Sequence, residues 1–193
     1  FTQALAERTK VAQRTDYATI AGWIGEGANV LDLGCGDGSL LAYLARERNA
    51  RGYGVEIGDA GVRASIGAGV NVIQRDLEGG LKGFADDAFD CVILSQTLQA
   101  MKRIETIIAE MLRVGREAIV SFPNFGHWRH RLQILRGRMP VSESLPYQWF
   151  DTPNIHLCTV KDFEELCIQV GAEILDERVL HEGGIVETLP NLL

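Results

Sequence analysis

Carboxylates and glycines at fixed spacing are the strongest chemical signal in this sequence. The stretch Val30–Leu40 reads V-L-D-L-G-C-G-D-G-S-L, with Asp32 ahead of glycines at alternate positions, Gly34, Gly36 and Gly38. Glycine is needed where the backbone takes a positive φ, or where a ligand lies against the main chain with no Cβ between them. The apolar run before the glycines and the helical pattern after them indicate a strand, a tight turn and a helix. The turn is a candidate small-molecule site, with an ordinary strand-to-helix turn as the alternative.

The spacing of this turn separates two classes of ligand. A dinucleotide fingerprint reads G-x-G-x-x-G and receives a pyrophosphate at the helix N-terminus, whereas this turn reads D-x-G-x-G-x-G. The carboxylate of Asp32 would repel a pyrophosphate, but it suits a ligand with an ammonium or sulfonium charge. S-adenosylmethionine carries both charges, so we expect it, or S-adenosylhomocysteine, to bind here.

Further polar residues end or follow the next predicted strands. Glu56, with Ile57 beside it, stands roughly twenty residues after the turn, the distance at which an acidic residue reaches a ribose. Asp76 ends a strand and could accept from an adenine amino group while the Leu77 amide donates to the ring. The plainer interpretations are a solvated strand end for Glu56 and a loop carboxylate or helix cap for Asp76. The expected cofactor-binding residues are Asp32, Gly34, Cys35, Gly36, Gly38, Glu56, Ile57, Asp76, Leu77, Ser95 and Gln96.

The apolar pattern predicts the elements that position these residues. Strands are expected at 29–33, 52–57, 70–74, 89–94 and 117–122, and helices at 17–24, 40–49, 59–69 and 99–113. Such alternation with short connections predicts an α/β fold, a mostly parallel sheet with helices on both faces, whose ligands bind beyond the carboxyl ends of the strands. Later elements are a helix at 160–170, begun by Thr159, and a strand at 172–180. Residues 1–14 are expected to form a helix-prone arm.

Residues 124–159 interrupt this alternation with prolines, aromatic residues and a basic section. A long connection of this content is usually functional. We expect an inserted cap or partner-binding segment within a single domain of residues 1–193. Its candidate substrate- or partner-binding residues are His127, Trp128, Arg129, Tyr147, Trp149 and His156. The plainer interpretations are structural, hydrogen-bonded histidines and a solvated arginine face.

Several motifs resemble those of known proteins. V-L-D-L-G-C-G-D-G-S-L, G-V-E-I, Q-R-D-L and F-D-C-V-I-L-S-Q-T-L-Q-A are similar to the successive motifs of the class I S-adenosylmethionine-dependent methyltransferases. A closer resemblance, from about Asp16 to Leu180, is to the MetW family of bacterial methionine biosynthesis proteins. It is carried by I-L-S-Q-T-L-Q-A, E-M-L-R-V-G-R-E-A-I-V-S-F-P-N-F-G-H-W-R, G-R-M-P-V-S and L-P-Y-Q-W-F-D-T-P-N-I-H-L-C-T.

The resemblance implies a seven-stranded Rossmann-like methyltransferase fold. It places the turn glycines beneath the methionine part of the cofactor and Glu56 on the ribose. Asp76 and Leu77 would contact the adenine, and Ser95 or Gln96 the methionine end. After residue 180, where the family has a last, antiparallel strand, the sequence reads G-G-I-V-E-T-L-P-N-L-L and stops. The presence of that strand is therefore in question.

Two functions from different classes remain open. The first is methyl transfer to a small molecule, for which His127, His130, Tyr147 and His156 are candidate bases. The second is a non-catalytic, regulatory or accessory role: the protein senses S-adenosylmethionine and modulates homoserine O-acyltransferase, the partner that the resemblance implies. The chain has no G-x-S-x-G nucleophile elbow, so it is not itself an acyltransferase of the α/β-hydrolase type.

Composition excludes other classes. With 193 residues, 46% hydrophobic residues and a net charge of −7, a globular domain without broad affinity for nucleic acid or anionic membranes is expected. No apolar run approaches the length of a membrane span, and the cytoplasm is the expected compartment. The four cysteines lack metal-site spacing and are expected to be buried free thiols. We expect no metal site, and a first residue of Phe1 indicates a piece of a longer protein.

Overall fold

The computed structural model describes residues 16–142, 145–181 and 184–186, with His181 and residues 184–186 without their side chains. These residues form two compact units, Tyr17–Phe122 and the part from Pro123 onward. The predicted arm at residues 1–14 lies outside the described residues. Organisation as a single domain stays a prediction.

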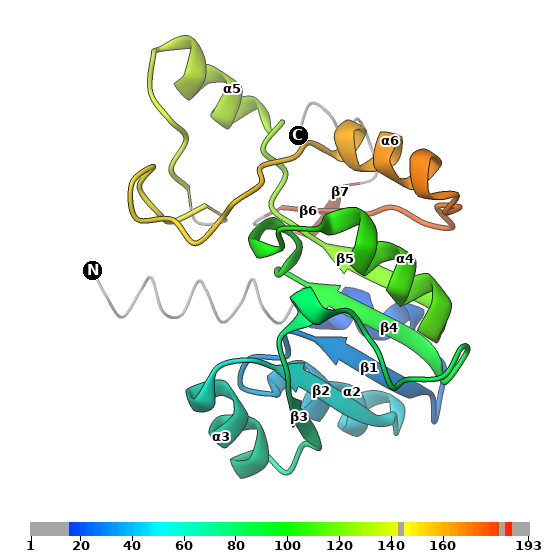
Figure 1. Ribbon diagram of the computed structural model, residues 1–193. Coiled ribbons are helices and arrows are strands. Elements are labelled where there is room, and N and C mark those ends of the chain that lie inside the picture. The colour runs from blue at the N-terminus through cyan, green and yellow to red at the C-terminus, as the bar shows by residue number, and fades with distance from the viewer. Residues whose placement is uncertain (1–15, 143–144, 182–183, 187–193) are drawn as a thin grey trace. The chain divides into compact units, whose positions relative to one another are not determined.

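The first unit is built on a five-stranded parallel sheet with the order β3-β2-β1-β4-β5 (Figure 1). Its strands are β1 (Asn29–Leu33), β2 (Arg51–Glu56), β3 (Val72–Gln74), β4 (Phe89–Ser95) and β5 (Gly115–Ser121). The strand order reverses between β1 and β4, and in open α/β sheets ligands bind at the carboxyl ends of strands at such a point. The predicted α/β class with a parallel sheet is confirmed.

Helices lie on both faces of the sheet. They are residues 16–23, α2 (Ser39–Arg48), α3 (Asp59–Gly67) and α4 (Ile104–Val114), with short 3₁₀ turns η1 (Leu77–Gly79) and η2 (Leu98–Ala100). Parallel crossovers are right-handed, and the chain moves from β1 to β2 in one direction but from β4 to β5 in the other. The connecting helices α2 and α4 therefore cover opposite faces.

The helix predicted from residue 99 begins later than expected, and the reason is a carboxylate. Glu78 accepts a hydrogen bond from the Lys102 amide at 2.7 Å and pairs with the Arg103 side chain. The backbone between η2 and α4 is extended at Met101. The Lys102 amide, which would donate within a continuous helix, thus donates to the Glu78 carboxylate outside it.

The core of this unit explains the continuous apolar runs. Val30, Leu31 and Leu33 of β1 are fully buried, as are Val92, Ile93 and Leu94 of β4. Central strands of a parallel sheet are covered on both faces, so they lack an alternating pattern. Of the cysteines, Cys35, Cys91 and Cys167 are buried and Cys158 is half-buried, and all are free thiols, as predicted. No helix among the described residues could cross a membrane.

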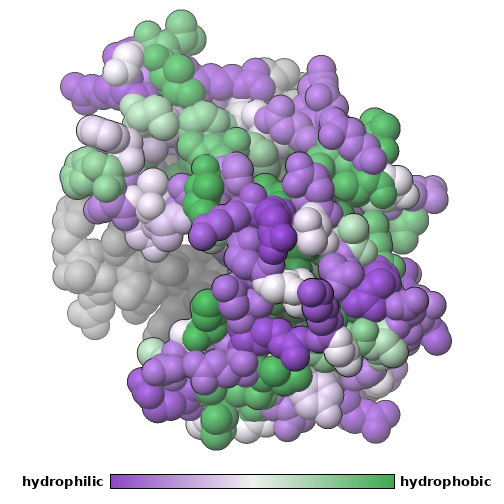
Figure 2. Space-filling view, in the orientation of Figure 1, coloured by the Kyte–Doolittle hydropathy of each residue, from purple (hydrophilic) through white to green (hydrophobic). Residues whose placement is uncertain are grey.

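The second unit contains two helices and a strand pair. These are α5 (Trp128–Leu135), α6 (Val160–Val170), β6 (Val179–His181) and β7 (Gly184–Val186). The helix predicted at 160–170 is confirmed, and Thr159 begins it through a capping box with Asp162. Hydrophobic residues lie on the surface over α5 (Figure 2), where Leu135 is 83% exposed.

The strand predicted at 172–180 is wrong over most of its length, because only β6 forms. Asp176 accepts from the Glu177 amide at 2.8 Å and pairs with Arg178 at 3.1 Å. Such local bonds compete with strand pairing. An antiparallel strand does follow residue 180: β7 pairs with β6 in a two-stranded sheet. The described strands thus form one sheet of five and another of two, and not the single seven-stranded sheet that the resemblance implies.

Candidate functional site

The glycine turn follows β1, and its three glycines serve different purposes. All three have left-handed φ values, +73° at Gly34, +55° at Gly36 and +77° at Gly38. A Cβ on Gly34 would lie 2.6 Å from Thr97 Oγ1, and one on Gly38 would lie 2.9 Å from Ser65 Oγ. A Cβ on Gly36 would meet nothing within 4 Å. Gly34 and Gly38 therefore permit close packing, whereas Gly36 faces open space that a ligand can fill.

The amides of the turn are already engaged within the chain. The Gly34 and Cys35 amides donate to the Val55 carbonyl at 2.8 and 3.1 Å, and the Gly38 amide donates to the Cys35 carbonyl at 2.9 Å. The Gly36 amide donates to Glu56 at 3.0 Å. A phosphate cradle needs free amides pointing at the ligand. This geometry agrees with the prediction against a pyrophosphate.

Asp32 is a buried carboxylate at the end of β1. Its side chain is 2% exposed, and no described residue donates a hydrogen bond to it or pairs with it. Burial, and next the charge of Glu56, raise the pKa of Asp32 to about 7. An unpartnered buried carboxylate is costly, and a ligand cation would compensate it.

Glu56 links the turn to the start of α3. Its Oε2 accepts from the Gly36 amide at 3.0 Å and its Oε1 from the Gly58 amide at 2.7 Å. Each carboxylate oxygen has a second lone pair, so hydroxyl donors can still bind. A Cβ on Gly61 would lie 2.8 Å from Glu56 Cγ and 2.9 Å from the Gly36 carbonyl oxygen. Glycine at position 61 thus lets α3 approach the turn.

Ser65 was missed by sequence reasoning. It is fully buried on α3, and its hydroxyl donates to the Gly36 carbonyl at 3.0 Å and lies 3.7 Å from Cys35 Sγ. The Cys35 thiol is 8% exposed, and burial is the main cause that raises its pKa to about 11. Cys35 can contact a ligand through its backbone, whereas its thiol is a packing group. The only available signal for Ser65 was a hydroxyl among the apolar residues of a helix.

Asp76 and Leu77 follow β3 in a segment that is held by α4. Asp76 caps η1 by accepting from the Glu78 amide at 2.9 Å, so the helix-cap interpretation is confirmed. Ile57, 62% exposed, follows β2 at the same end of the sheet. These residues are available to a nucleoside, but the cap occupies one Asp76 oxygen.

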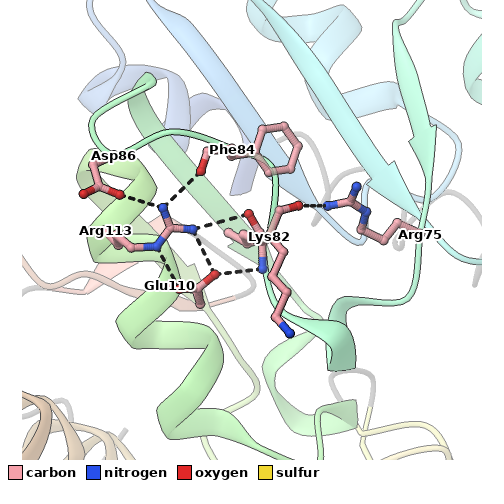
Figure 3. A network of polar contacts seen from close by, with 7 residues as sticks. Arg75, Lys82, Phe84, Asp86, Glu110 and Arg113 are labelled. Carbon is pink, nitrogen blue, oxygen red and sulfur yellow. Dashed lines mark hydrogen bonds and ion pairs between the residues drawn. The ribbon is translucent and has the colours of Figure 1, made fainter.

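A polar network holds the loop after η1 against α4 (Figure 3). The Arg113 guanidinium donates to Glu110 at 2.8 Å, to Asp86 at 2.7 Å and to the Phe84 carbonyl at 3.0 Å. Glu110 also accepts from the Leu81 amide at 2.9 Å. The hydrogen bond to Arg113 is the first cause of a lowered Glu110 pKa. The network is structural and fixes the loop that follows η1, the turn that Asp76 caps.

Ser95 ends β4 opposite Ser121, a residue that sequence reasoning missed, and Gln96 follows it. The Ser95 and Ser121 hydroxyl oxygens are 3.0 Å apart, and the Gln96 amide donates to the Ser121 carbonyl at 3.0 Å. The nearby side chains of Thr97 and Gln99 are also neutral. Hydroxyls and amides hold no proton-accepting group with a pKa near 7, so this loop supplies no general base.

The residues predicted in 124–159 have mixed roles in their own unit. His127 caps α5 by accepting from the Arg129 amide at 3.3 Å. His130 is 2% exposed, with Nδ1 3.2 Å from the Asn124 carbonyl and Nε2 3.0 Å from Ser142 Oγ. Burial lowers the pKa of His130. Both are thus structural, hydrogen-bonded histidines, the plainer interpretation.

The remaining candidates in this segment are exposed. The Arg129 guanidinium lies 5.6 Å from the Trp128 ring centroid. Tyr147 and Trp149 are 46% and 71% exposed, and His156 is also exposed. Trp149 lines a cleft of about 550 Å³ with Gln133, Gly137, Arg138, Met139, Val141 and Gln148. The described residues contain no group of three or more side chains that could hold a metal.

Comparison with known proteins identifies the family. Residues 14–192 match the family described as "Methionine biosynthesis protein MetW". The chain belongs to the MetW family. It is 38% identical over 179 residues to the bifunctional methionine biosynthesis protein MetXA/MetW of Rhodopirellula baltica, and the match covers 88% of this chain and 29% of that relative. This MetW chain thus spans less than a third of the relative's length.

Solved structures show the same fold at low identity. A SAM-dependent methyltransferase from Archaeoglobus fulgidus matches with a TM-score of 0.63 and 18% identity, covering 85% of this chain and 68% of that one. A possible histamine N-methyltransferase from Thermotoga maritima matches with a TM-score of 0.61 and 18% identity, covering 90% and 78%. The MetW chain therefore has the Rossmann-like methyltransferase fold that its motifs predicted.

Proposed function

We propose that this MetW protein binds S-adenosylmethionine or S-adenosylhomocysteine at its glycine turn. The observation that carries the proposal is the buried, unpartnered carboxylate of Asp32 at the start of a turn whose Gly36 leaves room for a ligand. The cofactor's ammonium and sulfonium charges complement this carboxylate and the nearby charge of Glu56. The residues therefore fit the cofactor.

Each expected contact has a donor or acceptor to offer. Glu56 has spare lone pairs for ribose hydroxyls, and Asp76 has a second carboxylate oxygen for an adenine amino group. Ile57 offers an exposed apolar surface to the adenine ring. Ser95 and Gln96 are assigned to the methionine end. When bound, S-adenosylmethionine supplies an electrophilic methyl group.

Methyl transfer to a small molecule is the first candidate activity, because the family has this fold and the site suits this cofactor. A base is needed where the acceptor must lose a proton. The β4 loop supplies none, and His130 is committed to two hydrogen bonds. His127, Tyr147 and His156 remain as candidates, of which His127 already accepts a bond from the Arg129 amide.

An accessory role to homoserine O-acyltransferase is the second candidate, and one comparison favours it. The Rhodopirellula baltica relative joins MetXA and MetW in one named protein, which supports physical association of MetW with the acylating enzyme. The exposed Trp128, Arg129 and Trp149 are residue types that anchor protein interfaces. Binding of S-adenosylmethionine would then report the level of the end product of the pathway.

A paired assay separates the two activities. The protein is incubated with S-adenosylmethionine and candidate small molecules, and S-adenosylhomocysteine formation is measured. The homoserine acyltransferase from the same source is assayed with and without the protein, at several cofactor concentrations. Turnover supports the first candidate, and cofactor-dependent acyltransferase activity without turnover supports the second. If the protein shows neither turnover nor an effect on the acyltransferase, both candidates are contradicted.

A further inference from the structure

The carboxyl ends of β4 and β5 meet at a pair of serines. Ser95 and Ser121 are register partners in the two parallel strands, and their hydroxyl oxygens lie 3.0 Å apart. Both side chains are half-buried. Paired residues of neighbouring strands share one face of the sheet, so the two hydroxyls form a small polar group at the end of the sheet where ligands bind.

Ser121 also holds the residue that follows β4, Gln96, in an uncommon conformation. Gln96 has a φ of +51°, a left-handed conformation that is uncommon for a residue with a side chain. The Gln96 backbone amide donates to the Ser121 carbonyl oxygen at 3.0 Å and to the Ser121 hydroxyl oxygen at 3.2 Å. The Gln96 side-chain Nε2 also lies 3.4 Å from Ser121 Oγ. The carbonyl and the hydroxyl oxygen of Ser121 thus both accept hydrogen bonds from Gln96.

The hydrogen bonds among Ser95, Gln96 and Ser121 leave one donor and one acceptor unused, the Ser95 O–H and Gln96 Oε1. A serine oxygen has two lone pairs, and the two N–H groups of Gln96 use both on Ser121. The Ser121 hydroxyl must then donate to Ser95 Oγ. Because Ser95 accepts this bond, its own O–H remains available, and Gln96 Oε1 has no hydrogen bond among the described residues.

This donor and acceptor lie beside the glycine turn. Thr97 follows Gln96 and donates to the Ser95 carbonyl at 2.9 Å. Its side chain packs against Gly34 so closely that a Cβ there would lie 2.6 Å from Thr97 Oγ1. A hydroxyl donor and an amide acceptor match the carboxylate and the ammonium of an amino acid, the part of the ligand expected over the turn.

We propose that Ser121 is a positioning residue for the amino-acid end of the ligand. It orients the Ser95 hydroxyl toward the ligand carboxylate and the Gln96 amide oxygen toward the ligand ammonium, without touching the ligand itself. This inference rests on the proposed function. It adds a residue from β5 that was not among the cofactor-binding residues expected from the sequence.

The test compares two ligands that share a nucleoside. S-adenosylhomocysteine has the amino-acid end, and 5′-deoxy-5′-methylthioadenosine lacks it. Titration of the Ser121→Ala variant should show S-adenosylhomocysteine binding about tenfold more weakly than in the wild type, the scale of one hydrogen bond to a charged group. Methylthioadenosine should bind within about twofold of wild type. Ser121→Thr, which keeps the hydroxyl, should restore S-adenosylhomocysteine binding.

Other outcomes would overturn the proposal in distinguishable ways. Equal weakening of both ligands would show that Ser121 only supports the fold, and unchanged binding of both would remove Ser121 from the site. Failure of Ser121→Thr to restore binding would show that the hydroxyl is not the active group. If the wild type binds neither ligand, the proposed function itself fails, and this inference fails with it.

Discussion

The Glu56 carboxylate accepts the Gly36 amide at 3.0 Å, across twenty residues of sequence. The same carboxylate accepts from Gly58 at 2.7 Å, so one side chain joins the glycine turn to the start of α3. Glu56 therefore organises the turn before any ligand binds. Its expected role on a ribose and this structural role use different lone pairs of the same two oxygens.

Replacing Glu56 by glutamine should weaken S-adenosylhomocysteine binding. The variant loses the charge and one of the acceptors, so the expected loss is about 1.5–3 kcal/mol, the scale of a hydrogen bond to a charged group. Calorimetric titration measures it. Glu47→Gln, on the exposed surface of α2, is the matched control and should bind like the wild type. Unchanged affinity in the Glu56 variant would remove it from the site.

Two glycines of α3 should respond in opposite ways to alanine. A Cβ at Gly61 would lie 2.9 Å from the Gly36 carbonyl oxygen, whereas one at Gly67 would meet nothing within 4 Å. Gly67→Ala should raise the free energy of unfolding by up to about 1 kcal/mol through helix propensity. Gly61→Ala should lower it and weaken cofactor binding. Urea unfolding and titration compare the pair, and equal behaviour would contradict this packing.

Asp32 should make stability and binding depend on pH in opposite senses. Its pKa is raised to about 7, above the usual value of about 3.9 in an unfolded chain, so the folded state binds the extra proton. The free energy of unfolding should therefore fall as pH rises from about 4 to 7. Ligand binding should tighten through pH 7, because the cation needs the ionised carboxylate.

The Asp32→Asn variant separates these two effects. At pH 8 it should be more stable than the wild type by about 2–4 kcal/mol, since one pKa unit corresponds to about 1.4 kcal/mol. It should bind S-adenosylmethionine more weakly and lose the rise in affinity through pH 7. Thermal unfolding and titration at pH 5 and pH 8 measure both. A variant as sensitive to pH as the wild type would contradict this account.

Trp149 tests the proposed partner surface. It is 71% exposed, and exposed tryptophans are frequent anchors of interfaces. Trp149→Ala should abolish co-purification with homoserine O-acyltransferase and leave S-adenosylhomocysteine affinity unchanged. Ile168→Ala, at a 77% exposed position on α6, is the control and should retain the partner. Loss of both partner and ligand binding in the Trp149 variant would contradict the assignment.

The sequence predicted most of the parallel sheet because its signals are local. Apolar runs such as Val92–Leu94 and the glycines after β1 specify strand and turn without reference to distant residues. Thr159 and Asp162 likewise begin α6 through a local capping box. The late start of α4 has a distant cause, because Glu78 accepts from the Lys102 amide. The error at 172–180 has a local one, the bonds of Asp176 to Glu177 and Arg178.

The supporting residues of the site could not be predicted for the same reason. Ser65 reaches Gly36 across 29 residues, and Ser121 reaches Gln96 across 25. Ser65 lies outside the quoted motifs, and the motif that contains Ser121 does not indicate its partner. Only folding brings each serine beside the segment that it holds. The buried state of His130 was also invisible, because its partner Ser142 lies beyond the end of α5. Motifs therefore predicted which residues would face a ligand, but not which residues hold those residues in place.

Calorimetric titration of S-adenosylmethionine, and then of S-adenosylhomocysteine, into the purified protein at pH 8 tests the central claim most directly. The account predicts saturable binding of at least one of them with a stoichiometry of one per chain, weakened in Glu56→Gln and unchanged in Glu47→Gln. The absence of a heat of binding with either ligand at about millimolar concentration would contradict it. Binding would then be weaker than about 4 kcal/mol of free energy. The glycine turn would then be a structural remnant of the methyltransferase fold.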